Sequence, residues 1–237
     1  MRPTIVLVHG AFAESASWNQ VIDPLVTAGH PVIAAANPLR GLAADAAAVS
    51  DLLHTVDGPV LLVGHSYGGA VISNVAADAA EITGLVYVAA FAPGPGEDCN
   101  TLAGRFPGST LGETLRPVTR RDGTTDLYIT SDRFHGQFCA DVPPRQAARM
   151  AATQRPVTLQ ALTEASGERP LWRELPSWFL ISEKDRNIPA VLQRFMAQRA
   201  GARHILEIPG ASHAVAVSQP AATAELILEA ATLPVAI

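Results

Sequence analysis

Short apolar segments alternate with longer amphipathic segments along most of this chain. Several of the short segments are apolar at consecutive positions, as expected for parallel strands that helices cover on both faces. The longer segments have the spacing of apolar residues that is typical of helices. The predicted strands are Ile5–Val8, Val32–Ala35, Val60–Val63, Gly84–Ala89, Trp178–Ile181 and Ile205–Ile208.

The predicted helices fill the intervals between these strands. Two of them stop at a glycine, Gly29 and Gly201, which is the residue type favoured just after a helix end. The predicted helices are Ser17–Ala28, Ala43–Thr55, Tyr67–Ala80, Ala190–Ala200 and Pro220–Ala231. Regular alternation of strand and helix favours an α/β fold with a doubly wound, mostly parallel sheet of about six strands.

One region, residues 93–174, breaks this alternation. It contains Gly- and Pro-rich turns, a predicted hairpin around Arg121–Thr124, and helical stretches near Pro144–Gln154 and Thr158–Ala165. An insertion of roughly eighty residues is too long for an ordinary loop. We therefore predict a structured cap over residues 93–174, inserted into a core domain formed by residues 1–92 and 175–237.

The composition argues against several classes of function. Hydrophobic residues make up 48% of the 237 positions and charged residues 16%, which is typical of a soluble globular protein. The formal charge of −5 and the lack of a basic stripe argue against nucleic acid or anionic membranes as partners. The N-terminus leads into a strand without a signal-peptide pattern, so we expect a cytoplasmic protein. Metal-ligand spacings and nucleotide-binding fingerprints are missing from the sequence, and we expect no cofactor.

The strongest local motif is Gly64-His65-Ser66-Tyr67-Gly68-Gly69, which follows a predicted strand and opens a predicted helix. This is the context of a nucleophile elbow, in which a tight turn lifts a serine hydroxyl clear of the sheet and glycines allow close backbone approach. The context matters because the pattern Gly-x-Ser-x-Gly alone would arise by chance in about 7% of chains of this composition. We predict Ser66 as a nucleophile.

A serine hydroxyl needs a base that takes its proton, and the chain has seven histidines. His213 stands apart because it follows the last predicted strand and the turn Pro209–Ser212, where this order of strands brings a base to the elbow. His65 is expected to point away from its neighbour Ser66. The other histidines are His9, His30, His54, His135 and His204.

An acid that orients the base should lie between the serine and the histidine in the chain. Asp185 meets this requirement, since it follows the predicted strand Trp178–Ile181. Its expected task is to hold the imidazole tautomer without taking the proton itself. The alternatives are Glu183, two residues upstream, and Asp98 or Glu97 after the preceding strand. A helix cap is a structural role that Asp185 could combine with catalysis.

A tetrahedral intermediate also needs backbone N–H groups that converge on its oxyanion. The N–H of Tyr67 is one candidate, and the second would come from Ala11 or Phe12 in the turn after the first strand. Aromatic residues in and near the cap either line a pocket or pack the cap against the core. The pocket candidates are Phe12, Phe91, Phe134, His135, Phe138 and Trp172.

With these motifs in order, the chain resembles the α/β-hydrolase superfamily from end to end, and within it the small methylesterase and hydroxynitrile-lyase group. The matching segments are Val8–Ala11, Val63–Gly69, Ala89–Pro93, Glu183–Pro189 and Gly210–His213. The resemblance implies the α/β-hydrolase fold, with a cap over the active site and a sheet that begins at what is usually the third strand.

Three departures separate the chain from other activities of that superfamily. The hydroxynitrile lyases of the group carry a lysine directly after the catalytic histidine, where this chain has Ala214. Their threonine near the oxyanion turn is also replaced, here by Ala11. Dehalogenases of this fold have an aspartate at the elbow in place of Ser66. The resemblance is therefore to an esterase rather than to a lyase or a dehalogenase.

Together these residues predict a serine hydrolase that cleaves a small, largely apolar carboxylic ester through an acyl-enzyme on Ser66. His213 would serve as general base and acid, and Asp185 would orient it. The alternatives are lactone or amide hydrolysis, other acyl or lyase chemistry on a secondary metabolite, and a ligand receptor on a hydrolase scaffold. The expected partner is a small ester-like molecule, and the sequence leaves the oligomeric state open.

Overall fold

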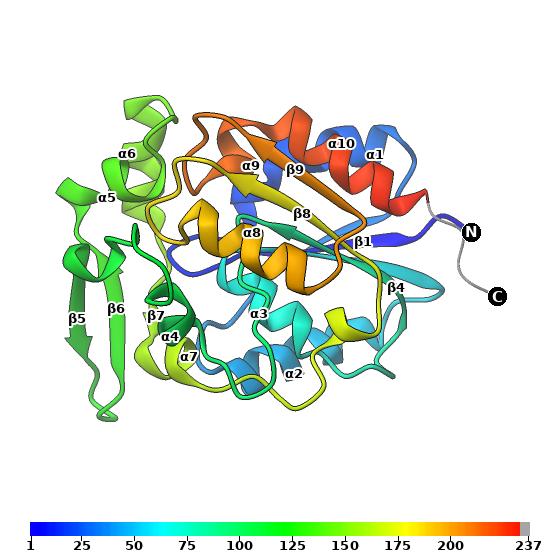
Figure 1. Ribbon diagram of the computed structural model, residues 1–237, viewed down its shortest axis with the longest axis horizontal. Coiled ribbons are helices and arrows are strands. Elements are labelled where there is room, and N and C mark those ends of the chain that lie inside the picture. The colour runs from blue at the N-terminus through cyan, green and yellow to red at the C-terminus, as the bar shows by residue number, and fades with distance from the viewer. Residues whose placement is uncertain (233–237) are drawn as a thin grey trace.

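A parallel sheet runs through the centre of the protein in the computed structural model, which describes residues 1–232 (Figure 1). Its strand order is β2-β1-β3-β4-β8-β9, and every neighbouring pair is parallel. All six predicted strands are confirmed with small shifts at their ends. They are β1 (Thr4–Val8), β2 (Val32–Ala35), β3 (Pro59–His65), β4 (Glu81–Val88), β8 (Ser177–Ser182) and β9 (His204–Ile208).

Helices cover both faces of this sheet, as the alternation predicted. One face carries α1 (Asn19–Thr27), α9 (Val215–Ser218) and α10 (Pro220–Ala231), preceded by the short helix η1 (Ser15–Trp18). The other face carries α2 (Leu42–Leu53), α3 (Tyr67–Ser73) and α8 (Ala190–Arg199) (Figure 1). No helix within residues 1–232 is both long and apolar enough to cross a membrane.

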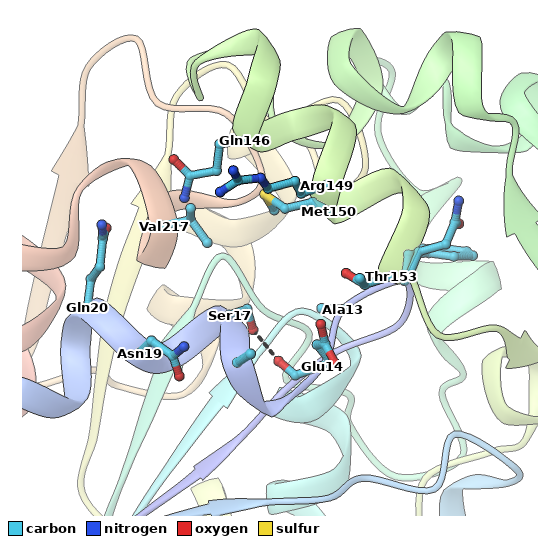
Figure 2. Close-up of a pocket in the computed structure, with 13 residues that line it drawn as sticks. Ala13, Glu14, Ser17, Asn19, Gln20, Gln146, Arg149, Met150, Thr153 and Val217 are labelled. Atoms are coloured by element: carbon cyan, nitrogen blue, oxygen red, sulfur yellow. Dashed lines mark hydrogen bonds between the residues drawn. The ribbon is translucent and has the colours of Figure 1, made fainter.

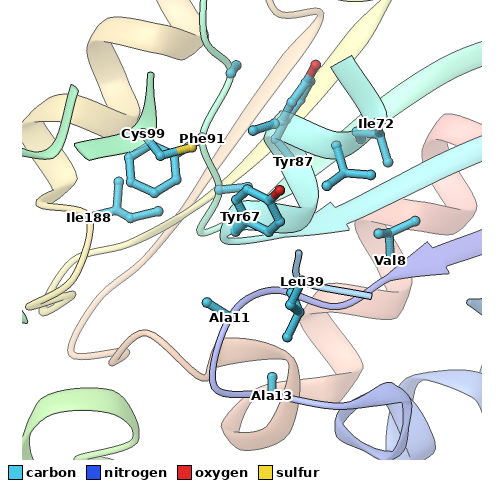
Figure 3. Close-up of a cluster of buried hydrophobic side chains, with 14 of the residues drawn as sticks. Val8, Ala11, Ala13, Leu39, Tyr67, Ile72, Tyr87, Phe91, Cys99 and Ile188 are labelled. Carbon is cyan, nitrogen blue, oxygen red and sulfur yellow. The ribbon is translucent and has the colours of Figure 1, made fainter. Parts of the chain in front are cut away.

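Side-chain alternation along the strands divides the interior into two apolar clusters. In β1, Ile5 and Leu7 point into the cluster beneath α1 and α10, whereas Val6 and Val8 point into the opposite one. This follows from the two-residue repeat of a strand, which sends successive side chains to opposite faces. Figure 3 shows part of the second cluster, where Val8 and Tyr67 lie close to the turn that follows β1.

Helix α3 is shorter than predicted: it ends at Ser73 instead of Ala80. The side chain of Asn74, the next residue, donates to the carbonyl of Ala70 at 2.9 Å and accepts from the N–H of Gly167 at 2.8 Å. Asparagine side chains compete in this way with the helical backbone hydrogen bonds. The stop therefore depends on a contact with the inserted segment, which helical periodicity does not reveal.

The chain between β4 and β8 adds a series of shorter elements, drawn in green and yellow-green in Figure 1, whose buried side chains join the apolar cluster that contains Val6 and Val8. These elements include an antiparallel sheet of order β5-β6-β7, and the predicted hairpin is its β5–β6 pair. Helix α6 was predicted, whereas α4, α5 and β7 were not. The elements are α4 (Cys99–Ala103), η2 (Leu111–Thr114), β5 (Leu115–Thr119), β6 (Thr125–Ile129), α5 (Ser131–Phe138), α6 (Pro144–Thr153), β7 (Val157–Thr158), α7 (Leu159–Thr163) and η3 (Leu171–Arg173).

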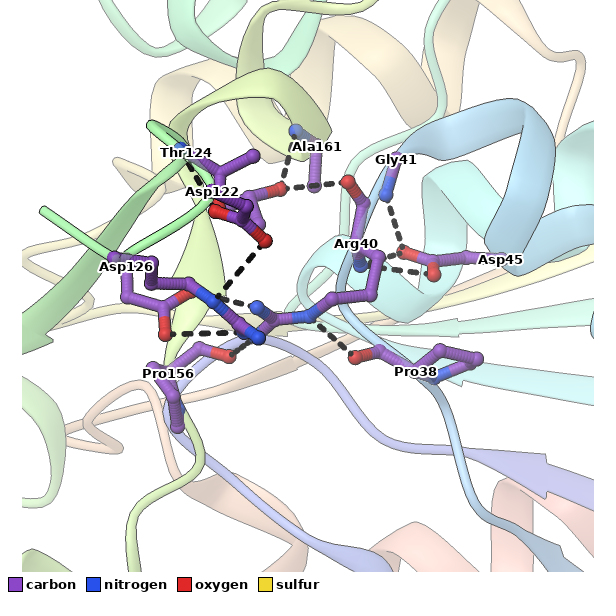
Figure 4. Close-up of polar contacts among 11 residues, drawn as sticks. Pro38, Arg40, Gly41, Asp45, Asp122, Thr124, Asp126, Pro156 and Ala161 are labelled. Carbon is purple, nitrogen blue, oxygen red and sulfur yellow. Dashed lines mark hydrogen bonds and ion pairs between the residues drawn. The ribbon is translucent and has the colours of Figure 1, made fainter.

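Arg40, in the loop after β2, ties this insertion to the core (Figure 4). Its guanidinium pairs with the Asp126 carboxylate at 2.6 Å and donates to the carbonyl of Pro156 at 2.8 Å. Its own N–H donates to the buried Asp45 carboxylate at 2.9 Å, which also accepts the hydroxyl of Tyr67 at 2.7 Å. Burial raises the pKa of Asp45. A network of polar contacts thus links Asp126 in β6, through Arg40 and Asp45, to Tyr67, the residue that follows Ser66.

Candidate active site

Ser66 lies in the sharp turn between β3 and α3, as the motif predicted. Its backbone has φ 55° and ψ −124°, a left-handed region that non-glycine residues rarely adopt and that costs about 1–3 kcal/mol. The surrounding backbone holds this conformation: the Ser66 carbonyl accepts the N–H of Gly69 at 3.0 Å and that of Phe91 at 3.1 Å, and its own N–H donates to Val88 at 3.2 Å. The side chain is therefore fixed at the end of β3.

Close backbone packing explains the glycines around this turn. A Cβ atom on Gly68 would lie 2.3 Å from the carbonyl oxygen of Val8. A Cβ atom on Gly10 would lie 2.6 Å from the Cβ of Ser66 and 3.1 Å from its Oγ. Real Cβ atoms do not approach other heavy atoms this closely. Gly10 therefore sets the space that the serine side chain occupies.

We expect Gly10→Ala to lower both the activity and the stability of the protein. The added methyl group would push against Ser66 and its backbone, and overpacking of this kind costs about 1–3 kcal/mol. Urea denaturation and ester turnover measure the two effects. Gly112→Ala is the matched control, because a Cβ atom there would meet nothing within 4 Å. Equal behaviour of the two variants would contradict this account of Gly10.

His213 and Asp185 form a buried pair at the same edge of the sheet. The Nδ1 atom of His213 lies 2.7 Å from Oδ2 of Asp185, and their side chains are 1% and 0% exposed. Asp185 follows β8 and His213 follows β9, two neighbouring parallel strands whose carboxyl ends meet at this edge. The backbone N–H groups of Asn187 and Ile188 donate to the other carboxylate oxygen at 2.7 and 2.9 Å. The carboxylate is thereby fixed in a turn before α8, a structural role that coexists with its bond to histidine.

Gln193 is a residue of this site that the sequence motifs did not reveal. Its amide donates to Oδ2 of Asp185 at 2.9 Å and to the carbonyl of Ile188 at 2.7 Å, and it accepts the N–H of Ser182 at 3.2 Å. It belongs to α8 and is 1% exposed. A polar residue on the buried face of a helix was the available signal, since buried amides need partners.

The competing acids are engaged elsewhere. Asp98 accepts from the N–H and the hydroxyl of Thr101, as the N-cap of α4. Glu97 pairs with Arg199 at 2.8 Å. Glu183 accepts the N–H of Gly210 at 2.8 Å. Among the described residues, Asp185 is the carboxylate that hydrogen-bonds to His213.

His65 and His9 are buried neutral groups beside the site. The Nε2 atom of His65 donates to the backbone carbonyl of His213 at 2.9 Å. Nε2 of His9 accepts the N–H of Asn37 at 3.2 Å, which leaves its Nδ1–H to donate to the carbonyl of Gly10. Burial lowers the pKa of His65 to about 3 and that of His9 to about 4. Both rings therefore stay uncharged at neutral pH and hold the backbone of the site.

These two histidines are expected to make the protein lose stability below pH 6.5. Unfolding returns each to its ordinary pKa of 6.5, so the unfolded chain takes up protons that the folded chain excludes. Their contribution is complete above pH 6.5 and falls toward the folded values, by about 1.4 kcal/mol per pH unit for each histidine. Urea denaturation between pH 7 and pH 5 measures the slope. His65→Gln should make the slope shallower, and an unchanged slope in this variant would contradict the assignment.

The backbone donors expected for an oxyanion differ in their availability. The N–H of Phe12 donates to the carbonyl of Arg155 at 3.1 Å, so it is already used. No hydrogen-bond acceptor among residues 1–232 takes the N–H of Ala11. Tyr67 is the first residue of α3, where backbone N–H groups lack a partner within the helix. The arrangement leaves Ala11 and Tyr67 as the candidate pair.

The aromatic pocket candidates divide into two groups. The rings of Phe12 and Phe134 lie 6.5 and 5.0 Å from that of Phe138, which in turn lies 5.0 Å from the His213 ring. The remaining candidates, His135, Trp172 and Phe91, make no ring contact with these residues in the described part of the chain. Nε2 of His135 donates to the carbonyl of Val142 in the same segment, and Trp172 donates to the carbonyl of Pro93. Phe91 lines a separate apolar hollow beside α4.

A pocket of about 360 Å³ opens beside the Phe12 turn (Figure 2). It lies between η1 with the start of α1 on one side and α6 on the other, and Gln146, Arg149 and Met150 reach into it from α6. Phe12 and Val217 form part of its wall, whereas Ser66, Asp185 and His213 do not line it. Phe12 thus stands between this pocket and the stack of rings next to His213.

Comparisons with known proteins identify the family and the fold. A model described as the alpha/beta hydrolase family matches residues 5–226. A pyrethroid hydrolase of Sphingobium wenxiniae is 28% identical over 97% of this chain and 88% of its own length. Salicylic acid-binding protein 2 of Nicotiana tabacum is 27% identical over 95% and 96%.

A solved structure extends the likeness to three dimensions. The crystal structure of polyneuridine aldehyde esterase superposes with a TM-score of 0.79 at 18% identity and covers 97% of this chain and 99% of that one. The resemblance inferred from the motifs is thereby confirmed, together with the fold class. The chain belongs to the alpha/beta hydrolase family.

Proposed function

We propose that this protein is a serine hydrolase that cleaves small, largely apolar carboxylic esters through an acyl-enzyme on Ser66. The observation that carries the proposal is the buried 2.7 Å contact between His213 and Asp185, at the sheet edge where the strained turn presents Ser66. The family, the pyrethroid hydrolase and a further relative named as a putative methylesterase of Arabidopsis thaliana make the chain a carboxylic ester hydrolase. The residues and the acyl-enzyme are our assignment.

In the first half of the proposed reaction, Oγ of Ser66 attacks the ester carbonyl carbon while Nε2 of His213 takes the hydroxyl proton. The bond of Nδ1 to Asp185 keeps Nε2 free of a proton beforehand and stabilises the imidazolium that forms. The N–H groups of Ala11 and Tyr67 stabilise the oxyanion, a role worth about 3 kcal/mol for each donor. The imidazolium then gives its proton to the departing alcohol.

In the second half, a water molecule replaces the alcohol. His213 takes a proton from the water as it attacks the acyl carbonyl, and returns the proton to Oγ of Ser66 when the carboxylic acid leaves. His65 contributes to the geometry because its Nε2–H donates to the carbonyl of His213 and its ring stays uncharged. The proposed cycle consumes one water for each ester.

An apolar substrate is supported by the surroundings of the histidine. The ring of Phe138 contacts His213 and that of Phe12 contacts Phe138, and the buried Ala214 occupies the position of the lysine found in hydroxynitrile lyases. A cation that could stabilise a cyanide leaving group is therefore lacking at this position. The relatives named above include a hydrolase of pyrethroids, and the proposal for this chain is limited to small apolar esters.

A fluorophosphonate probe tests the proposed mechanism directly. The purified protein is treated with the probe, digested, and analysed by peptide mass, with Ser66→Ala as a parallel sample. Labelling of Ser66 alone, together with faster turnover of linear esters than of lactones and amides, would support the proposal. Labelling with a clear preference for lactones or amides would revise the substrate class. A folded protein that takes no label but binds small molecules tightly would indicate a receptor and overturn the mechanism.

A further inference from the structure

The end of helix α5 lies where the loops that follow β8 and β9 meet. Figure 1 shows α5 on the side of the sheet toward which the arrows of these two strands point. Consecutive residues of the helix contact the two loops. Gln137 contacts Arg186 in the loop that carries Asp185, and Phe138 contacts Ala214 in the loop that carries His213. This helix was not predicted from the sequence, and the proposed function uses its aromatic side chains but gives Gln137 no role.

Gln137 is a buried polar side chain whose amide group is held by hydrogen bonds. It is 5% exposed. Its amide nitrogen donates to the carbonyl of Arg186 at 2.9 Å and to the side-chain oxygen of Asn187 at 2.7 Å. Its amide oxygen accepts the hydroxyl of Thr110 at 2.8 Å. Both N–H donors and the oxygen are thus used, which fixes the orientation of the amide.

These contacts lead in one further step to the proposed triad. The backbone N–H of Asn187, whose side chain Gln137 holds, donates to Oδ1 of Asp185 at 2.7 Å. Oδ2 of the same carboxylate contacts Nδ1 of His213 at 2.7 Å. The Asn187 side chain is buried, so water does not compete for the contact with Gln137. A displacement of Gln137 therefore acts on the carboxylate through a short, buried path.

The same end of α5 also holds the other loop. The carbonyl of Phe138 accepts the N–H of Ala214 at 3.0 Å, and its ring meets that of His213 edge-on at 5.0 Å. Three residues further on, Asp141 accepts the hydroxyl of Ser212. The residues on both sides of His213 are therefore bonded to the segment that begins with Gln137.

We propose that Gln137 is a positioning residue for the triad, which acts through Asn187 to hold Asp185 against His213. The inference rests on the proposed function for its effect on turnover. The acid and the base come from different strands, and α5 gives both loops a common support. A misplacement of such groups by about 1 Å is enough to cost up to ~100-fold in rate.

Gln137→Met tests the proposal, because methionine has a similar volume and none of the hydrogen bonds. Asn74→Leu is the matched control. The Asn74 amide also joins the insertion to the core, through Gly167 and Ser166, but it follows the last residue of α3, whereas Ser66 precedes the first. We expect Gln137→Met to lower kcat for a reporter ester by ~10-fold or more with KM within about twofold, and Asn74→Leu to leave kcat within about twofold. Gln137→Asn, which keeps a shortened amide, should recover part of the loss.

Equal kcat values for wild type and the Gln137 variants would overturn the proposal. Equal losses of kcat in Gln137→Met and Asn74→Leu would also overturn it, because they would indicate a general loosening of the insertion. If Gln137→Met does not fold, Gln137→Asn decides by the same comparison. The downfield proton resonance of Nδ1–H of His213 gives a readout that needs no substrate. Loss or shift of this resonance in the Gln137 variant alone would support the proposal even if the protein turned over no ester; an unchanged resonance would overturn it.

Discussion

Ser66→Ala is expected to lower kcat for a small reporter ester by roughly 10⁴- to 10⁶-fold. Without Oγ there is no acyl-enzyme, and the His213–Asp185 pair has no hydroxyl from which to take a proton. The residual rate would come from substrate binding and from the oxyanion donors alone. Steady-state kinetics with active-site titration measures the loss, provided that thermal unfolding shows the variant to be folded.

Ser73→Ala provides a control on the same helix. Ser73 is buried in α3, and its hydroxyl bonds to the carbonyl of Gly69 and the hydroxyl of Tyr87. The variant should lose about 1 kcal/mol of stability, the usual contribution of such a bond, and keep its kcat within a small factor. If Ser66→Ala kept most of the wild-type turnover, the nucleophile would have to be sought elsewhere.

Asp185→Asn is expected to lower kcat by about 10⁴-fold. The Asp185 carboxylate acts only as an acceptor. Its donors are two backbone N–H groups, the amide of Gln193 and Nδ1 of His213. An asparagine must turn its NH₂ group toward some of these donors, so the imidazole loses the partner that selects its tautomer. The measurement is kcat/KM against a reporter ester, with near-ultraviolet circular dichroism to confirm the fold.

Asp98→Asn is the control that separates the two candidate acids. Asp98 caps α4, and asparagine is an equally good cap, so both stability and turnover should change little. A larger loss from Asp98→Asn than from Asp185→Asn would show that the acid is placed after β4 and not after β8. Glu97 is bound to Arg199 and offers no third possibility without breaking that pair.

The sequence predicted the main sheet because its strands are runs of apolar residues with few other interpretations. Val60–Val63 lies inside β3, and Pro220–Ala231 coincides with α10. The insertion was harder to predict. Strand β7 has only two residues, Val157 and Thr158, and α5 contains Gly136 and a mixed pattern, so neither has a clear period. These elements are held by contacts with distant parts of the chain.

The candidate site divides in a similar way. Ser66, Asp185 and His213 follow strands in motifs that are local in sequence, and they could be named before their contacts were seen. Gln193 and Gln137 belong to no motif, and their importance depends on partners that come together only in the folded chain. The occupied N–H of Phe12 is a further example, since Arg155, which accepts it, is far away in sequence.

The Arg40 junction limits how a new specificity could be engineered into this scaffold. Arg40 belongs to the core, whereas the Asp126 carboxylate and the Pro156 carbonyl that it binds belong to the insertion. A chimaera in which a foreign segment replaced residues 93–174 would keep Arg40 and lose both of these partners. The guanidinium would then lose its partners close to the buried Asp45, which supports Tyr67. An exchange of residues 93–174 in this chain therefore has to keep the two partners of Arg40 in place.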